Sequence, residues 1–127
     1  MANLTYLDFA LDEWLYLSDA YSKGLRYNAM VSQAQRICEC YLKHVITTRL
    51  VNNNDVMRSH NLRTIYTYIV NDLRLPLQSI HDWVMCLNNF YNHTRYPGYE
   101  AFMASEQDID ASVSALSKII RALQEYL

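Results

Sequence analysis

The stretch RYNAMVSQAQRICECYLKHVITTRL, residues 26–50, carries the clearest structural pattern in the chain. Its apolar residues recur at spacings of three and four, which is the period of an amphipathic α-helix with one buried face. Gln35, Glu39 and Lys43 fall outside the apolar stripe, so we expect them on the outer face of this helix. Glu39 and Lys43 are in the favourable i,i+4 order and should form an ion pair at the surface or at an interface.

The same spacing predicts four further helices. They run from about Asn3 to Ser22, His60 to Arg74, Leu77 to Asn92 and Ser105 to Leu127, and residues 51–59 are expected to form a polar loop. Residues typical of helix ends mark the boundaries: Gly24, Ser59 or Asn61, Pro76, Pro97 with Gly98, and a capping box over residues 105–108. No segment alternates as a strand would. The sequence therefore predicts an all-α, up-and-down antiparallel bundle of four to five helices.

Length and composition indicate a single domain, residues 1–127, that can build its own core. Hydrophobic residues make up 51% and charged residues 19%, the balance of a globular protein, and no apolar run is long enough to span a membrane. The acidic N-terminal stretch lacks the basic region of a secretory signal. Three cysteines without framework spacing are expected to be buried, reduced thiols, and we expect a cytoplasmic protein.

Charge is distributed unevenly along the chain. Residues 1–22 carry a net −4, residues 23–95 a net +5 and residues 96–127 a net −3. Most of the central bases are Arg, which suits bidentate recognition of phosphate or carboxylate. The alternative is that these Arg residues lie on solvated helix faces and pair with the acidic terminal helices.

The sequence offers little for metal or cofactor chemistry. Cys40 and His44 lie four residues apart on one helix and could supply two ligands, but no further ligand has matching spacing. The chain has only two Gly and no Gly-rich phosphate loop, which argues against a P-loop or dinucleotide-binding enzyme. We therefore expect neither a metal nor a cofactor.

Three stretches, taken in order, carry a resemblance. The predicted second helix contains AQRICECYLK (residues 34–43), the third opens with HNLRTI (60–65), and the fourth ends in LNNFYNHTRYP (87–97). Together they resemble the HEPN domain family, in particular a branch whose fourth helix ends in Thr-Arg-Tyr-Pro. The resemblance spans roughly residues 5–125.

The resemblance implies a four- or five-helix antiparallel bundle that often dimerises. Many family members are metal-independent ribonucleases, in which an Arg precedes a His by four to six residues at this helix end. A neutral imidazole can take the proton of a ribose 2′-hydroxyl, and an Arg can hold the scissile phosphate. Other members bind nucleotides or partner proteins and are often encoded beside a minimal nucleotidyltransferase, as toxin–antitoxin pairs.

The catalytic pair of the family is incomplete in this chain. Asn88 stands five residues before His93, where the family resemblance places the Arg, and it supplies no positive charge. Arg95 follows His93 in inverted order. Arg74 and His81 formally meet the spacing but straddle Pro76 at the start of the helix.

Candidate ligand-binding residues gather around this helix end: Arg95, Tyr96, Asn89, Asn88, Tyr91 and His60. Arg95 could clamp phosphate and Tyr96 could stack on a base, or the two could anchor the turn. His60 could instead order the preceding loop through a hydrogen bond.

Three functions stay open. The first is a nucleotide-, RNA- or partner-binding module that acts as a homodimer or with a nucleotidyltransferase. The second is a ribonuclease that uses His93. The third is a purely structural interaction module.

Overall fold

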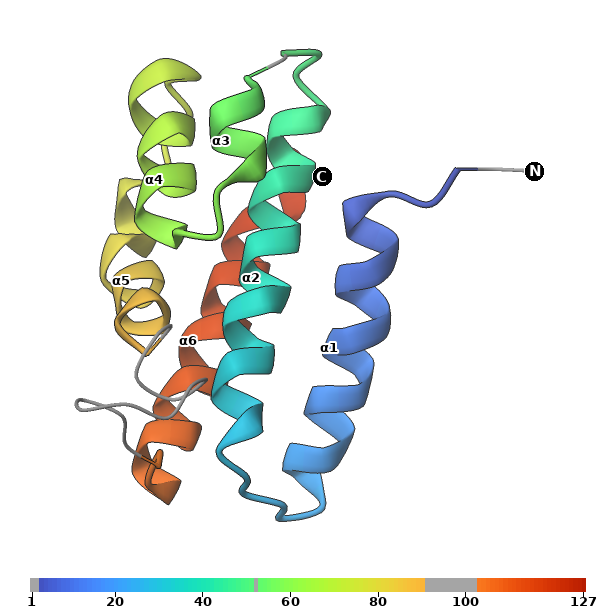
Figure 1. Cartoon of the computed structure of the whole chain (residues 1–127), viewed down its shortest axis with the longest axis vertical. Coiled ribbons are helices and arrows are strands. Elements are labelled where there is room, and N and C mark those ends of the chain that lie inside the picture. The colour runs from blue at the N-terminus through green and yellow to red at the C-terminus, as the bar shows by residue number, and fades with distance from the viewer. Residues whose placement is uncertain (1–2, 52, 91–102) are drawn as a thin grey trace.

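The computed structural model describes residues 3–51, 53–90 and 103–127, and it folds as a helical bundle (Figure 1). The longer helices are α1 (Tyr6–Ser22), α2 (Ala29–Thr47), α5 (His81–Asn89) and α6 (Glu106–Leu123). The shorter elements are α3 (Asn54–Arg58), α4 (Leu62–Thr67), the π-helical turn η1 (Tyr68–Asp72) and the 3₁₀ turns η2 (Gln78–Ile80) and η3 (Gln124–Tyr126). Because the described residues contain no strand, the predicted all-α bundle is confirmed.

The central helix is α2, which packs against α1, α4, α5 and α6. The apolar stripes of these helices meet in one core, which includes Leu17 of α1, Ile37 and Tyr41 of α2, Leu87 of α5 and Leu116 of α6. Within the described ranges, no helix is both long and apolar enough to cross a bilayer.

Local hydrogen bonds explain where α1 and α6 begin and where α1 ends. Ser105 and Asp108 form the predicted capping box at the start of α6, and Thr5 and Asp8 form a second one at the start of α1. After α1, Gly24 adopts a φ of +87°, a conformation that favours glycine, and its N–H donates to the carbonyl of Tyr21. Gly24 thus ends α1 as predicted.

The middle of the chain departs from the prediction in two places. Residues 51–59 contain α3, because Asn53 accepts a hydrogen bond from the N–H of Val56 and the Val56 side chain is buried. The predicted third helix is divided into α4 and η1, with Asn61 as its cap. The helix predicted from Leu77 begins as the turn η2, and its predicted end at Asn92 lies outside the described residues.

Candidate functional site

Three polar side chains of α2 lie on one face of the helix and are buried. Gln35, Glu39 and Lys43 are only 1%, 8% and 3% exposed. The expectation that they lie on the outer face is therefore wrong. The chain leading into α4 passes over this face and covers it, as its hydrogen bonds to Gln35 and Glu39 demonstrate.

Glu39 is at the centre of this buried network. Its Oε2 lies 2.9 Å from Nζ of Lys43 and 3.0 Å from Nδ1 of His60. Gln35 donates from Nε2 to the carbonyl oxygen of His60 at 3.0 Å. His60 therefore orders the loop before α4 through hydrogen bonds, and the predicted Glu39–Lys43 pair forms in the interior.

Asn88 joins the end of α5 to the start of α4. Its Oδ1 accepts a hydrogen bond from the backbone N–H of Leu62 at 2.9 Å, and Leu62 is fully buried. The N–H of a first-turn residue has no partner inside its own helix, so this side chain satisfies a buried donor. The position expected to hold a catalytic Arg is thus occupied by a neutral structural acceptor.

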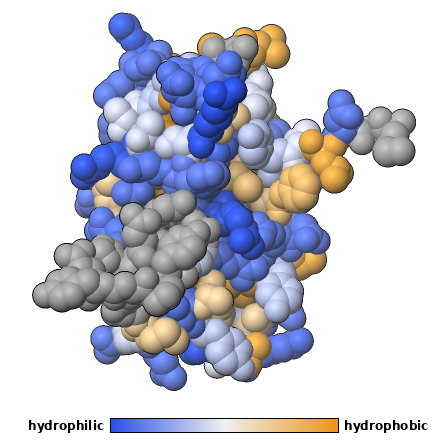
Figure 2. Space-filling model, viewed as in Figure 1, coloured by the Kyte–Doolittle hydropathy of each residue, from blue (hydrophilic) through white to orange (hydrophobic). Residues whose placement is uncertain are grey.

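The contacts of Asn88 and Gln35 bring the end of α5 and the start of α4 to one edge of the bundle, which we call the α4–α5 edge (residues 58–63 and 88–89). The His60 side chain is 65% exposed there, and Asn89 is also exposed. Arg58 and Arg63 are exposed and form no ion pair with the described residues. Figure 2 shows a largely hydrophilic surface over α3 and α4.

Two other bases of the central segment are paired with the terminal helices. Arg26 contacts Asp110 of α6 at 2.9 Å, and Arg36 forms an ion pair with Glu13 of α1. The pairing alternative thus holds for Arg26 and Arg36. Among the described residues, Arg58 and Arg63 of the α4–α5 edge have no such acidic partner.

Several predicted ligand-binding residues lie outside the described residues: Tyr91, His93, Arg95 and Tyr96. The structure brings together His60, Asn88 and Asn89 from the predicted set. Arg58 and Arg63 were not predicted as site residues, although both flank the His-x-Leu stretch that pointed to this surface.

A family model described as the HEPN domain matches residues 7–126. The chain belongs to the HEPN family. No curated protein and no solved structure matched it. Of the stretches that carried the resemblance, α2 contacts His60 through Gln35 and Glu39, and α5 contacts Leu62 through Asn88. Residues 91–97 of the third stretch lie outside the described residues.

The remaining candidate chemistry of this HEPN chain is weak. No group of three His, Cys, Asp or Glu side chains that could hold a metal occurs in the part of the chain that the structure describes. Burial raises the pKa of the thiols of Cys38, Cys40 and Cys86, which disfavours the thiolate needed for a metal ligand or a nucleophile. His81 faces the carboxylate of its neighbour Asp82 at 3.0 Å.

Replacing Asn88 with Ala should lower the free energy of unfolding by about 1–3 kcal/mol, because the buried N–H of Leu62 loses its acceptor. Asn88→Asp keeps an acceptor oxygen at the same place, so its free energy of unfolding should fall by clearly less. Urea unfolding followed by circular dichroism measures both variants. Equal losses in the two would mean that the hydrogen bond to Leu62 does not stabilise the junction.

Proposed function

We propose that this HEPN chain binds phosphate groups of single-stranded RNA or of a nucleotide at the α4–α5 edge, and that it does not cleave RNA. The observation that carries the proposal is the hydrogen bond between Asn88 Oδ1 and the Leu62 N–H. It gives the residue at the expected catalytic position a structural role. The edge itself keeps exposed bases without an anionic partner among the described residues.

The residues at this edge suit phosphate recognition. A guanidinium such as that of Arg58 or Arg63 can donate two hydrogen bonds to one phosphate. Arg95 and Tyr96 follow the end of α5 by a few residues in the sequence, and we include them as a further phosphate clamp and a stacking platform for a base. The exposed His60 and Asn89 add hydrogen-bonding groups.

A cleavage reaction would need more than this edge offers. A ribonuclease of this family pairs a general base with a positive charge that holds the scissile phosphate. His93 could serve as the base, but Asn88 carries no charge and its carbonyl oxygen is already bonded. Binding without cleavage is therefore the function that the chain supports best.

The test is binding of a fluorescent single-stranded RNA by anisotropy in EDTA, from about 50 to 200 mM salt, with a gel of the same RNA. We expect affinity to fall with salt, by about 0.7 in log K for each phosphate contact per tenfold salt. Arg63→Ala and Arg95→Ala should weaken binding and flatten this slope. Arg36→Ala is the matched control, since Arg36 pairs with Glu13 away from the edge.

The outcomes separate the alternatives. A flat salt response, or equal losses in Arg36→Ala and Arg63→Ala, would contradict the proposed site. Displacement of the RNA by unlabelled ATP at comparable concentration would identify a mononucleotide as the ligand. RNA cleavage that disappears in His93→Ala would establish a ribonuclease and overturn the proposal. If neither RNA nor ATP binds, the proposal is wrong and a protein partner is the remaining alternative. A nucleotidyltransferase encoded nearby would be the first partner to test.

A further inference from the structure

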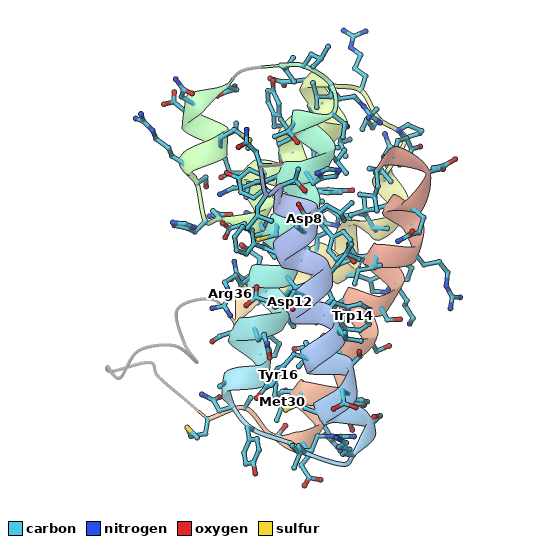
Figure 3. The ribbon with its side chains drawn as sticks, turned by 90° about the vertical axis from the view of Figure 1, so that its right-hand side faces the viewer. Asp8, Asp12, Trp14, Tyr16, Met30 and Arg36 are labelled. Atoms are coloured by element: carbon cyan, nitrogen blue, oxygen red, sulfur yellow. The ribbon has the colours of Figure 1, made fainter. Side chains whose placement is uncertain are left out.

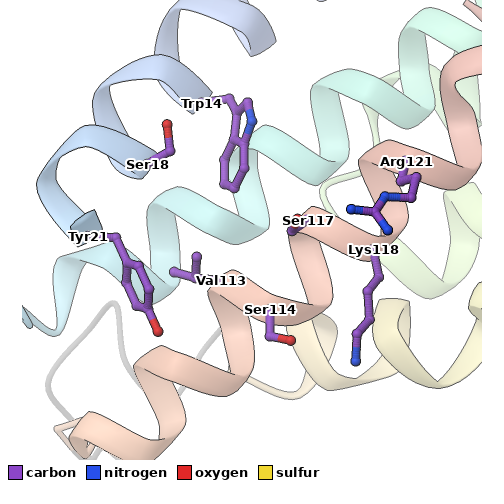
Figure 4. Close-up of a pocket in the computed structure, with 8 residues that line it drawn as sticks. All are labelled: Trp14, Ser18, Tyr21, Val113, Ser114, Ser117, Lys118 and Arg121. Carbon is purple, nitrogen blue, oxygen red and sulfur yellow. The ribbon is translucent and has the colours of Figure 1, made fainter.

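A surface groove separates the first long helix from the last. Helices α1 and α6 both pack on α2, and between them lies a hollow of about 430 Å³ (Figure 4). This volume is within the usual range of small-molecule sites, about 300–1,000 Å³. The hollow, which we call the α1–α6 groove, is lined by side chains of residues 14–21 and 113–121. None of them belongs to the α4–α5 edge, so the groove is a separate candidate site.

Polar contacts close one end of the α1–α6 groove. Helices α1 and α6 run in opposite directions, so Tyr21 lies beside the start of α6. The Tyr21 hydroxyl donates to Oδ1 of Asp110 at 2.8 Å, and Nε of Arg26 donates to the same oxygen at 2.9 Å. The hydrogen bonds from Tyr21 and Arg26 lower the pKa of Asp110, which keeps the carboxylate ionised beside the guanidinium. No charge at this end is left for an anionic ligand.

The opposite end of the groove carries positive charges that no acid balances. Arg121 is exposed and forms no ion pair with the described residues. Glu125 follows it by four residues, but an Arg that precedes a Glu is in the less favourable order for a helical ion pair. Lys118 also lacks an acidic partner in the described part of the chain. Its ammonium lies 5.3 Å from the centre of the Trp83 ring, a contact that leaves its charge in place.

The acidic side chains of α1 that are nearest to Trp14 in the sequence do not neutralise this end. Glu13 and Asp19 are each held in an ion pair with a base. Asp12 precedes Trp14 by two residues, which places it about 200° away around the helix. Figure 3 shows the two side chains on different sides of α1, with Trp14 toward α6. The end of the groove between Trp14 and Arg121 is therefore positive.

Between its two ends, the groove has aromatic and apolar walls. Trp14 and Tyr21 extend from α1 toward α6, where Val113 lines the other wall (Figure 4). Trp14 and Tyr21 are seven residues apart, about 10 Å along the helix, which leaves room for a bicyclic ring with its substituent. Aromatic rings pack favourably on one another, so these walls suit an aromatic ligand. Ser114 and Ser117 add hydroxyl groups that form no hydrogen bond with the described residues.

We propose that the α1–α6 groove binds a small aromatic carboxylate. The aromatic ring packs between Trp14 and Val113, and the carboxylate accepts hydrogen bonds from the guanidinium of Arg121. Figure 4 shows this guanidinium directed toward the Trp14 side of the groove. An Arg guanidinium can donate two parallel hydrogen bonds to one carboxylate, and such charge-assisted bonds are stronger than neutral ones. Ser117, about one turn before Arg121 on α6, supplies a further donor.

The charges along the groove favour a carboxylate over a phosphate group. A phosphate monoester carries about −1.5 to −2 charges at neutral pH. The guanidinium of Arg121 reaches toward Trp14, whereas the ammonium of Lys118 lies by the Trp83 ring of α5. One guanidinium matches the single charge of a carboxylate. At the far end, Asp110 offers no attraction to a second anionic group.

NMR spectroscopy of the ¹⁵N-labelled full chain tests the groove with two probes of the same shape. Indole-3-acetate carries a carboxylate, and indole-3-acetamide carries a neutral amide in its place. We expect indole-3-acetate to shift the indole N–H signal of Trp14 and the backbone signals of residues 113–121 until they saturate. The amide should bind at least about tenfold more weakly, because it lacks the charge-assisted bonds. Unchanged signals at these residues, or equal affinities of the two probes, would overturn the proposal.

A pair of variants tests the role of Arg121. Arg121→Gln removes the positive charge and should raise the dissociation constant of indole-3-acetate at least about tenfold, while that of the amide stays within about twofold. Arg63→Gln is the matched control, since Arg63 is also an exposed base without an acidic partner among the described residues but lies at the α4–α5 edge. Both positions are exposed, and the NMR spectra check that both variants fold. Equal effects of the two variants would contradict the site.

A titration with AMP separates this groove from the phosphate site proposed for the α4–α5 edge. AMP also combines an aromatic ring with an anionic group, but that group is a phosphate. We expect AMP to leave the signals of Trp14 and residues 113–121 in place at concentrations that saturate the groove with indole-3-acetate. AMP shifts at these residues that disappear in Arg121→Gln would show that the groove takes a nucleotide, and would overturn the proposed carboxylate. Because the two sites share no residue, either proposal can fail while the other holds.

Discussion

Replacing Glu39 with Leu is expected to lower the free energy of unfolding by about 3–5 kcal/mol, because it leaves the buried ammonium of Lys43 without its carboxylate. The side chain of Lys43 is 4% exposed, so water cannot take over the lost contact. The replacement is apolar and similar in volume, and it leaves only a small cavity. Urea unfolding at neutral pH, followed by circular dichroism, measures the loss.

Two further variants separate the buried charge from other effects of the change. Glu39→Leu combined with Lys43→Met removes both charges and should recover most of the loss, as buried pairs replaced by apolar groups often do. Asp19→Leu breaks the Asp19–Lys23 pair, which has the same i,i+4 spacing on the surface, and should cost less than about 1 kcal/mol. Equal losses at the two sites would contradict a buried role for Glu39.

The burial of this pair could not be predicted from the period of apolar residues. The period of apolar residues identifies α2 and its core face, because that face packs along the whole helix. It cannot show that the loop before α4 covers a second, polar face, since that contact joins residues distant in the chain. A usable signal was present, however: Gln35, Glu39 and Lys43 are spaced four residues apart on a single face of the helix.

The shorter elements escaped prediction for a different reason. Helix α3 has one buried side chain, Val56, with the half-buried Met57 beside it, and two adjacent apolar residues show no helical period. Its start depends on the cap made by Asn53, which in the sequence reads as part of a polar loop. The π-helical turn η1 likewise differs from α4 in hydrogen bonding, not in its apolar spacing.

The candidate site was located from the sequence, but the contacts within it were not. The resemblance pointed to the start of α4 and the end of α5, and the structure joins these two places. The bond itself runs from a side chain to a backbone N–H of a residue 26 positions away. Every residue except Pro has a backbone N–H, so the identity of Leu62 gives no sign that Asn88 would bind it.

Leu87, the residue before Asn88, should be the position at which truncation most clearly damages the end of α5. Leu87 is fully buried in the core, and Leu87→Ala is expected to lower the free energy of unfolding by about 2–5 kcal/mol, through lost burial and the cavity left behind. Asn89→Ala is the matched control two residues later. Because the Asn89 side chain is exposed and forms no hydrogen bond with the described residues, this variant should change stability by about 0.5 kcal/mol or less.

The same two variants link the core to the proposed site. If the helix end is held by Leu87 and Asn88 while Asn89 faces the ligand, Leu87→Ala loses stability, and Asn89→Ala keeps stability but weakens RNA binding. The RNA affinity of both variants is measured by anisotropy without urea, at a temperature well below that of unfolding. A destabilised Asn89→Ala, or a Leu87→Ala variant as stable as wild type, would mean that the core does not fix the end of α5, and the α4–α5 edge could not then act as a preformed binding surface.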